Sequence, residues 1–275
     1  MQSKINSDGN LKSFDGTELY LRKDIPRNPK AIVVIVHGLC EHLGRYNYLA
    51  KRFNEFDYGV YRFDNRGHGQ SGGEKGYIDD FSFFFDDADV VVEKAKADYP
   101  DLPIFMLGHS MGGFIAGGYG LKYPNKLDGQ IFSGAATILL PIFEDLAKVD
   151  FDANPRVKVP NALSAVISRD EDVIKDYDND PLVLKETNQK LLGETFVKGP
   201  AWLEEHIKDY AYPCLILHGD DDRIVTKKAS EWFYNEISSK DKELKFYGGF
   251  FHEILNEKEK ERVIMDIRGW INIRL

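Results

Sequence analysis

The most constraining feature of the sequence is a serine between glycines at residues 108–112, in the pattern Gly-x-Ser-x-Gly. The preceding residues, 102–107, form a short apolar run that predicts a buried strand, and the residues after Ser110 are compatible with a helix. A sharp turn between strand and helix needs neighbours without side chains, and Gly108 and Gly112 supply them. Such a turn exposes a serine hydroxyl above the sheet edge. The same letters occur in ordinary turns, but their position between strand and helix favours a nucleophile at Ser110.

The rest of the chain alternates between strand and helix patterns. This alternation predicts a mostly parallel central sheet with helices on both faces, which is an α/β fold. A turn and alternating residues at 11–22 predict an entry hairpin before it. The expected strands are 31–36, 59–64, 102–107, 127–133, 212–219 and 243–247, and the expected helices are 81–98, 226–237 and 257–273.

The alternation stops between residues 134 and 206, where no run reads as a buried strand and several prolines occur. We expect a single domain, 1–275, with 134–206 inserted as a helical cap. The chain is 43% hydrophobic, which is enough for one large core. Apolar stretches at 138–143 and 162–167 are candidates for lining an acyl tunnel, for touching a lipid surface, or simply for packing the cap.

Charge and composition exclude several classes of function. The net charge of −9 argues against binding to nucleic acid or to an anionic surface. No apolar run reaches the roughly 18 residues of a spanning helix, and the first residues lack a signal-peptide core. We therefore expect a soluble, cytoplasmic protein without an obligate protein partner. Cys40 and Cys214 are too few for a disulfide framework or a zinc site, and nothing calls for a cofactor or metal.

A serine nucleophile needs a neighbouring base and a group that orients the base. Candidates follow the strands, because sites in parallel sheets lie at the carboxyl ends. Three aspartates at 220–222 follow the strand ending at Gly219, and His252 lies in a glycine-aromatic loop just after the strand ending at Tyr247. Each alone has a structural explanation. The order serine, aspartate, histidine along the chain, however, is that of α/β-hydrolases.

An oxyanion in such a site requires backbone donors. One comes from the residue after the serine, Met111, and another from the loop after an early strand, where we expect the Leu39 amide. His37, just before it, is interpreted as a residue that fixes this loop rather than as a catalyst.

With these residues in place, the chain resembles the α/β-hydrolase superfamily and, within it, monoacylglycerol lipases and lysophospholipase-like serine hydrolases. The resemblance extends from Phe14 to the last helix. It implies an ester substrate of lipid type and assigns Asp222 as the acid, with Asp220 as the alternative. Contact of the cap with a membrane surface is left open. The matching segments are 37–46, 64–71, 108–113, 168–170 and 177–183.

Some residues depart from this resemblance. Leu255 stands where animal monoacylglycerol lipases have a second histidine in the alcohol pocket, and Cys40 replaces a small residue. Glu41 is a candidate for contacting the alcohol head group, whereas Arg45 is interpreted as an internal salt-bridge anchor. The alternatives are a lysophospholipase, a feruloyl or short-chain carboxylesterase, an aminopeptidase, an acyltransferase, and a non-catalytic binding protein on the same fold.

Overall fold

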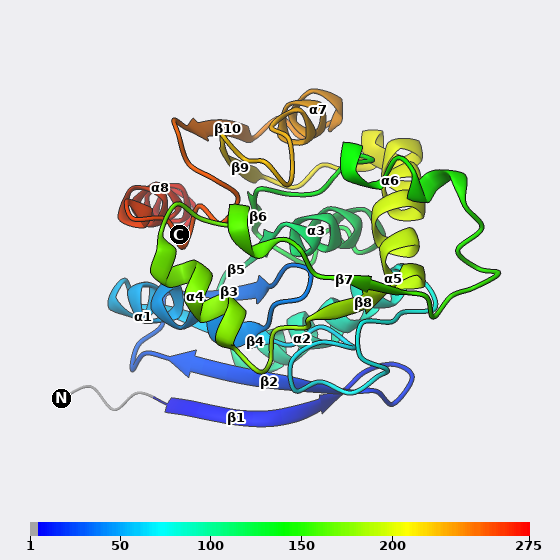
Figure 1. Ribbon diagram of the computed structural model, residues 1–275. Helices are drawn as coiled ribbons and strands as arrows, with labels where there is room; N and C mark the ends of the chain where they lie inside the picture. Colours follow the sequence, from blue (N-terminus) through cyan, green and yellow to red (C-terminus); the bar gives the residue numbers. More distant parts are fainter. Residues whose placement is uncertain (1–4) are drawn as a thin grey trace.

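The computed structural model describes residues 5–275, and its centre is an eight-stranded sheet (Figure 1). The first two strands form the predicted hairpin and pair antiparallel with each other, and the second of them also pairs antiparallel with the third strand in the order. The other neighbours in the sheet are all parallel. In spatial order the strands are β1 (Ile5–Lys12), β2 (Glu18–Ile25), β4 (Tyr58–Phe63), β3 (Ala31–Val36), β5 (Ile104–His109), β6 (Gly129–Ser133), β9 (Cys214–Gly219) and β10 (Lys242–Tyr247).

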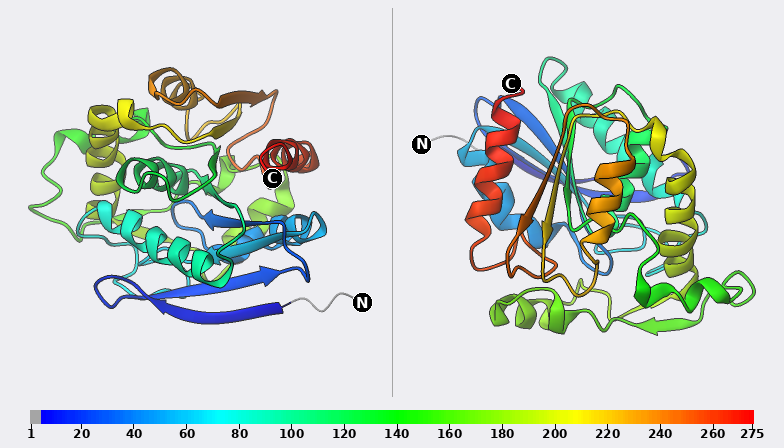
Figure 2. Two further views of the ribbon diagram at one scale, coloured as in Figure 1. Left: turned by 180° about the vertical axis from the view of Figure 1, so that it is seen from behind. Right: turned by 90° about the horizontal axis from the view of Figure 1, so that it is seen from above.

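Helices cover both faces of the sheet, as the apolar strands require. Successive side chains of a strand point to opposite faces. In β3, Val34 packs into one apolar cluster and Val33 into the other, and both are fully buried. The helices α2 (Ser82–Asp98), α3 (Met111–Lys122) and α7 (Lys228–Glu236) lie on one face, and α1 (Asn47–Glu55) and α8 (Lys260–Asn272) on the other (Figure 2).

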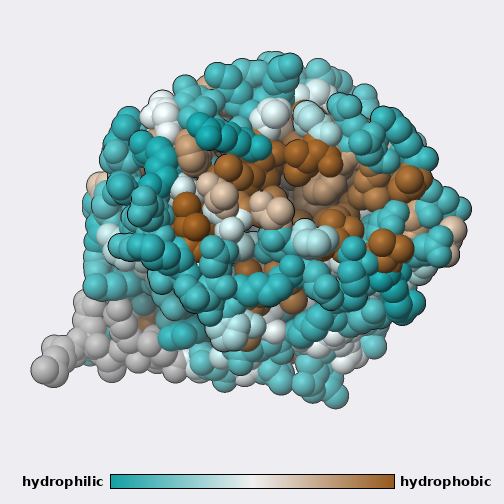
Figure 3. Space-filling model, in the orientation of Figure 1, coloured by the Kyte–Doolittle hydropathy of each residue, from teal (hydrophilic) through white to brown (hydrophobic). Residues whose placement is uncertain are grey.

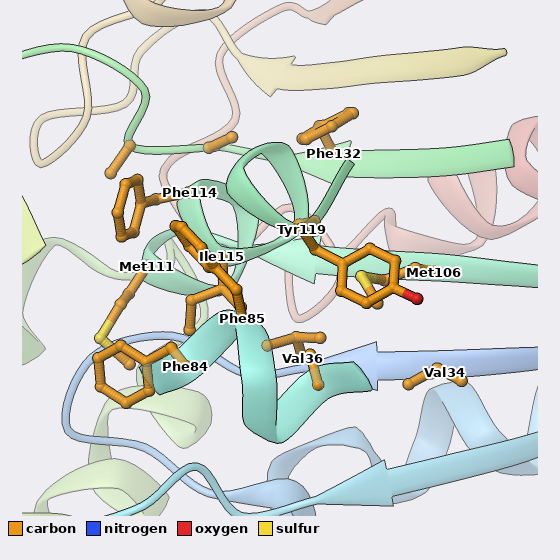
Figure 4. Packing of buried hydrophobic residues seen from close by; sticks show 14 of the residues in the cluster. Val34, Val36, Phe84, Phe85, Met106, Met111, Phe114, Ile115, Tyr119 and Phe132 are labelled. Carbon is orange, nitrogen blue, oxygen red and sulfur yellow. The ribbon is translucent and has the colours of Figure 1, made fainter. Parts of the chain in front are cut away.

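The helix that follows Ser110, α3, is buried along most of its length between the sheet and α2. Phe114 and Ile115 from α3 meet Phe85 from α2 and Val36 from β3 in one apolar cluster (Figure 4). Because both elements that flank Ser110 are locked in the core, the position of the serine is set by packing rather than by the loop alone.

The segment 134–206 lies across the carboxyl ends of the strands (Figure 2). In addition to short 3₁₀ turns, it contains an antiparallel pair that the sequence did not predict. Its strands have three residues each and one includes a proline, so they leave no periodic signal. The elements of this cap are β7 (Lys158–Pro160), α4 (Glu171–Asn179), β8 (Glu186–Asn188), α5 (Gln189–Gly193), a π-helical turn (Glu194–Lys198) and α6 (Gly199–His206).

Backbone hydrogen bonds tie the cap to the loops beneath it. The Leu184 amide donates to the Cys40 carbonyl at 2.9 Å, and the Glu253 amide donates to the Ile167 carbonyl at 2.7 Å. The cap is therefore closed over the ends of the strands. Across residues 5–275, no helix combines the length and apolar character needed to cross a bilayer.

Candidate active site

Ser110 sits between β5 and α3 with φ +54° and ψ −117°, a conformation that L-residues rarely adopt. Its amide donates to the Ser133 carbonyl of the neighbouring strand at 2.9 Å. A Cβ on Gly108 would lie 2.1 Å from the Gly112 carbonyl oxygen, and a Cβ on Gly112 would lie 2.1 Å from that of Val36. Both glycines are therefore needed for the backbone to pass this close, as the sequence indicated.

Asp222 and His252 form a buried pair. Nδ1–H of His252 donates to Oδ2 of Asp222 at 2.7 Å, and the side chains are 5% and 0% exposed. The other carboxylate oxygen, Oδ1, accepts the amides of Ile224 and Val225 at 2.8 and 2.9 Å. Asp222 thus fixes the histidine tautomer, leaving Nε2 of His252 free to accept a proton.

Opposing effects set the pKa values of this pair. Burial alone would raise the pKa of Asp222, but the charge and hydrogen bonds of His252 and His218 hold it well below its ordinary value. Burial alone would lower the pKa of His252, but the Asp222 carboxylate outweighs it and raises that pKa above 6.5. The carboxylate is therefore an anion that stabilises the protonated form of the ring.

Two further histidines pack against this pair, and neither was predicted from the sequence. Nε2 of His218 lies 3.2 Å from Oδ2 of Asp222 and donates to the Val225 carbonyl at 2.8 Å. The His109 ring packs against the His252 ring at a tilt of 48°, with centroids 4.7 Å apart, and burial lowers the pKa of His109 to about 3. Both precede a glycine or serine at the end of a strand, which is the only signal of their location in the sequence.

Leu39, in the loop after β3, lines the same cavity as Ser110, and Met111 is the first residue of α3, directly after Ser110. Neither amide donates a hydrogen bond to another residue in the described part of the chain. His37 anchors this loop, because its ring bonds to the Gly38 carbonyl at 2.8 Å and accepts the Asn65 amide at 2.9 Å. Burial lowers the pKa of His37 to about 4, so the ring is neutral. These contacts agree with the anchoring role that we expected for it.

Glu41 is 3% exposed and organises the same loop. Its Oε1 accepts the Gly38 amide at 2.6 Å and the Tyr46 hydroxyl at 2.7 Å, while Nε of Arg45 lies 3.3 Å from its Oε2. Arg45 also donates to Glu253 at 2.5 Å, which makes it the internal anchor that we expected. Glu253 directly follows His252 and was not predicted as a site residue.

These groups surround one small cavity of about 20 Å³, which is the room that a single water molecule needs. Ser110 and His252 both line it, although no hydrogen bond joins them among the described residues. Catalytic hydrogen bonds are often long in ligand-free structures. The other lining residues are Gly38, Leu39, Glu41, His109, Leu163, Ile167, Tyr177, Ile224 and Glu253.

Two positions discussed in the sequence analysis lie outside the cavity. Leu255 is 5% exposed and packs in the apolar cluster beneath α1 and α8. Asp220 is exposed, and it accepts the Gly249 amide at 2.7 Å rather than contacting His252. Asp222 is therefore the aspartate that meets the histidine.

The chain matches known proteins over most of its length. Residues 27–259 match the family model described as serine aminopeptidase, S33. A monoacylglycerol lipase of Mycolicibacterium smegmatis is 35% identical, over 89% of this chain and 89% of that protein. The phospholipase YtpA of Bacillus subtilis is 32% identical, over 88% of this chain and 95% of that protein.

Solved structures agree with the sequence match. The crystal structure of Paleococcus ferrophilus monoacylglycerol lipase superposes with a TM-score of 0.84 at 31% identity, covering 94% of this chain and all of that chain. The parallel sheet, the serine turn and the cap all lie within the matched region. The chain therefore belongs to the serine aminopeptidase S33 family of α/β-hydrolases and, within it, is similar to the monoacylglycerol lipases.

Proposed function

We propose that the chain hydrolyses carboxylic esters of lipid type, above all monoacylglycerols, through a Ser110–His252–Asp222 triad. The observation that carries the proposal is the shared cavity: the hydroxyl of a strained serine and an Asp222-bound imidazole line the same 20 Å³ space. A serine nucleophile, a histidine base and an aspartate that orients the base are the components of acyl transfer, and along this chain they follow one another as serine, aspartate and histidine.

The reaction proceeds in two halves. Ser110 Oγ bonds to the ester carbonyl carbon while its proton passes to Nε2 of His252. The Leu39 and Met111 amides stabilise the oxyanion, each contributing about 3 kcal/mol by analogy with other oxyanion holes. The alcohol then leaves with the proton from His252, and water, activated by the same ring, hydrolyses the acyl-enzyme.

The substrate must reach a cavity that the cap covers. A cavity of 20 Å³ holds neither an acyl chain nor glycerol, so the cap has to move before an ester can bind. Leu163 and Ile167, from one of the two apolar stretches, line the cavity and are suited to the first carbons of an acyl chain. In the other stretch, Leu140 is buried whereas Ile142 is 54% exposed.

The outer surface of the cap suggests how a lipid is reached. Four of the exposed large apolar side chains belong to the cap: Leu139, Ile142, Val149 and Val157. Apolar groups also gather around a hollow on this face of the molecule (Figure 3). Scattered exposed apolar residues need no explanation, but four of them on the segment that has to open for substrate entry fit transient contact with a lipid surface.

The test uses the purified protein and its Ser110→Ala variant. Both are incubated with 1- and 2-monoacylglycerols of several chain lengths, a lysophospholipid, methyl ferulate and an aminoacyl anilide, and released products are quantified. We expect acid release from glycerol esters that disappears in Ser110→Ala. Release only from ferulate, only from short esters, or only from the anilide would be consistent with Ser110 as the nucleophile but would contradict the lipase proposal. Failure of a fluorophosphonate probe to label folded protein would contradict the triad itself.

A further inference from the structure

The charged residues around the catalytic cavity are arranged unevenly. Apart from its two histidines, His109 and His252, its ionisable lining side chains are the carboxylates Glu41 and Glu253 and the Tyr177 phenol, and no lysine or arginine lines it in the described part of the chain. Arg45, which bridges the two carboxylates, faces a separate open pocket on the outside instead. The cavity wall is therefore anionic, and the positive charge of Arg45 lies outside the cavity.

The hydrogen-bonding capacity of Glu253 is only partly used. Both of its side-chain hydrogen bonds, from Arg45 at 2.5 Å and from Asn256 at 2.9 Å, go to Oε2. Its Oε1 accepts none among the described residues, although the side chain is only 6% exposed. Glu253 lines the same cavity as Ser110, so this carboxylate oxygen can accept a hydrogen bond from a ligand there.

The sum of the fixed charges near the cavity is negative. Glu41 and Glu253 contribute two negative charges and Arg45 one positive charge, and Asp222 adds a further negative charge next to a neutral His252. These side chains are all less than a tenth exposed, so salt screens their interactions with a bound group far less than it screens surface charges.

Two kinds of alcohol group respond differently to such a wall. The apolar part of the lining, including Leu163 and Ile167, suits the acyl chain, which leaves the carboxylates for the alcohol. A neutral polyol donates its hydroxyl protons to carboxylate oxygens. A phosphate monoester carries about −1.5 to −2 charges at pH 7 and offers mainly acceptors, so it is repelled.

We propose that Glu253, together with Glu41, makes the alcohol end of the site selective for uncharged, hydroxyl-bearing groups and against phosphate-bearing ones. This inference rests on the proposed ester hydrolysis and specifies its substrate class. Glu253 is then a specificity-determining residue that acts on the leaving group, whereas the acyl chain is selected by the cap.

The experiment compares two esters with the same oleoyl chain, monooleoylglycerol and 1-oleoyl-glycerol 3-phosphate, at equal mole fraction in non-ionic micelles. The quantity measured is the ratio of their kcat/KM values. Within one preparation this ratio does not depend on the fraction of active enzyme, so partial misfolding of a variant cannot imitate the effect. We expect the full-length protein to prefer monooleoylglycerol at least tenfold, equivalent to 1.4 kcal/mol.

Three variants test the cause. Glu253→Gln keeps the shape and removes the charge, and we expect it to shrink the preference at least tenfold. Glu253→Asp keeps the charge and should retain most of the preference. Asp176→Asn removes one exposed negative charge beside the outer pocket and should leave the ratio within a factor of two.

Added salt distinguishes repulsion inside the cavity from repulsion at the protein surface. In 0.5 M NaCl the repulsion between an anionic micelle and a protein of net charge −9 is screened, but the buried repulsion persists. A preference that disappears in salt, or that is unchanged in Glu253→Gln, would overturn the role of Glu253 while leaving ester hydrolysis intact. Absence of any Ser110-dependent hydrolysis would instead overturn the proposed function and this inference with it.

Discussion

At the scale of single residues, the three consecutive aspartates show how packing separates identical side chains. Asp220 is exposed and caps the Gly249 amide, and Asp221 is exposed and pairs with Arg223 at 3.4 Å. The Asp222 side chain is 0% exposed and accepts His252, which keeps it ionised in spite of burial. Only the third aspartate can hold the imidazole in the tautomer that acyl transfer needs.

Replacing this aspartate by its amide tests the assignment. Asp222→Asn preserves the shape but can donate to the ring, so the wrong nitrogen of His252 carries the proton. We expect kcat to fall by about 10⁴, the size of the effect in serine proteases. Asp220→Asn is the matched control and should keep kcat within about threefold. Comparable losses in both variants would contradict the choice of Asp222.

The pH dependence of activity follows from the raised pKa of His252. A general base must be unprotonated, so kcat/KM should rise with pH, with a midpoint above the ordinary value of 6.5. In Asp222→Asn the residual activity should show a lower midpoint, because burial then acts without the carboxylate. Initial rates between pH 5 and 9 on a soluble ester measure both. A midpoint below 6.5 in the unmodified protein would contradict the assignment.

At the scale of elements, the turn between β5 and α3 depends on close backbone approach. The strand and helix are each held by the core, and the glycines allow them to meet at Ser110 with a positive φ. The strain at this residue is maintained by packing on both sides, as is common at functional sites. The geometry of this turn therefore depends on the packing of β5 and α3 as well as on the Gly-x-Ser-x-Gly motif.

Two glycine substitutions distinguish close approach from helix propensity. In Gly112→Ala the new Cβ would lie 2.1 Å from the Val36 carbonyl oxygen, so we expect destabilisation by about 1–3 kcal/mol and loss of most ester hydrolysis. In Gly269→Ala, on α8, the new Cβ meets nothing within 4 Å, so the variant should gain up to about 1 kcal/mol. Urea unfolding measures both, and equal stabilities would contradict the steric explanation.

At the scale of the whole molecule, the cap connects the two loops that flank the serine. It hydrogen-bonds to the loop after β3 through Cys40 and to the loop that carries His252 through Glu253, and His42 in the first of these loops bonds to Asp180 in the cap at 2.8 Å. The cap movement that the proposed function requires would therefore break contacts to both loops at once. Substrate entry and the arrangement of the site are physically linked.

The apolar face of the cap gives a prediction at this scale. The double variant Leu139→Ser, Ile142→Ser should bind neutral lipid vesicles about tenfold more weakly, since less apolar surface is buried in the bilayer. Its hydrolysis of a soluble acetyl ester should stay within about twofold. Met265→Ser, at an exposed position on α8, is the control and should bind vesicles normally. Vesicle co-sedimentation provides the measurement, and unchanged binding of the double variant would contradict cap docking.

Local patterns were enough to predict the sheet, the serine turn and the candidate site residues, because these features depend on neighbouring residues. The apolar run at 31–36 coincides with β3. The glycines on either side of Ser110 were predicted because a sharp turn leaves no room for side chains there, and the structure shows this crowding. Strand ends were predicted to within a few residues, while β7 and β8 were missed because three-residue strands have no measurable periodicity.

Long-range packing sets which side chains share burial and charge, and no local pattern predicted it. It separated Asp222 from its exposed neighbours and brought His218 against the same carboxylate. It also turned Glu253 toward the cavity and left Leu255 in the core. None of this is encoded in a local pattern, since desolvation and ion pairing depend on which side chains the fold places within a few ångströms, often from segments more than a hundred residues apart.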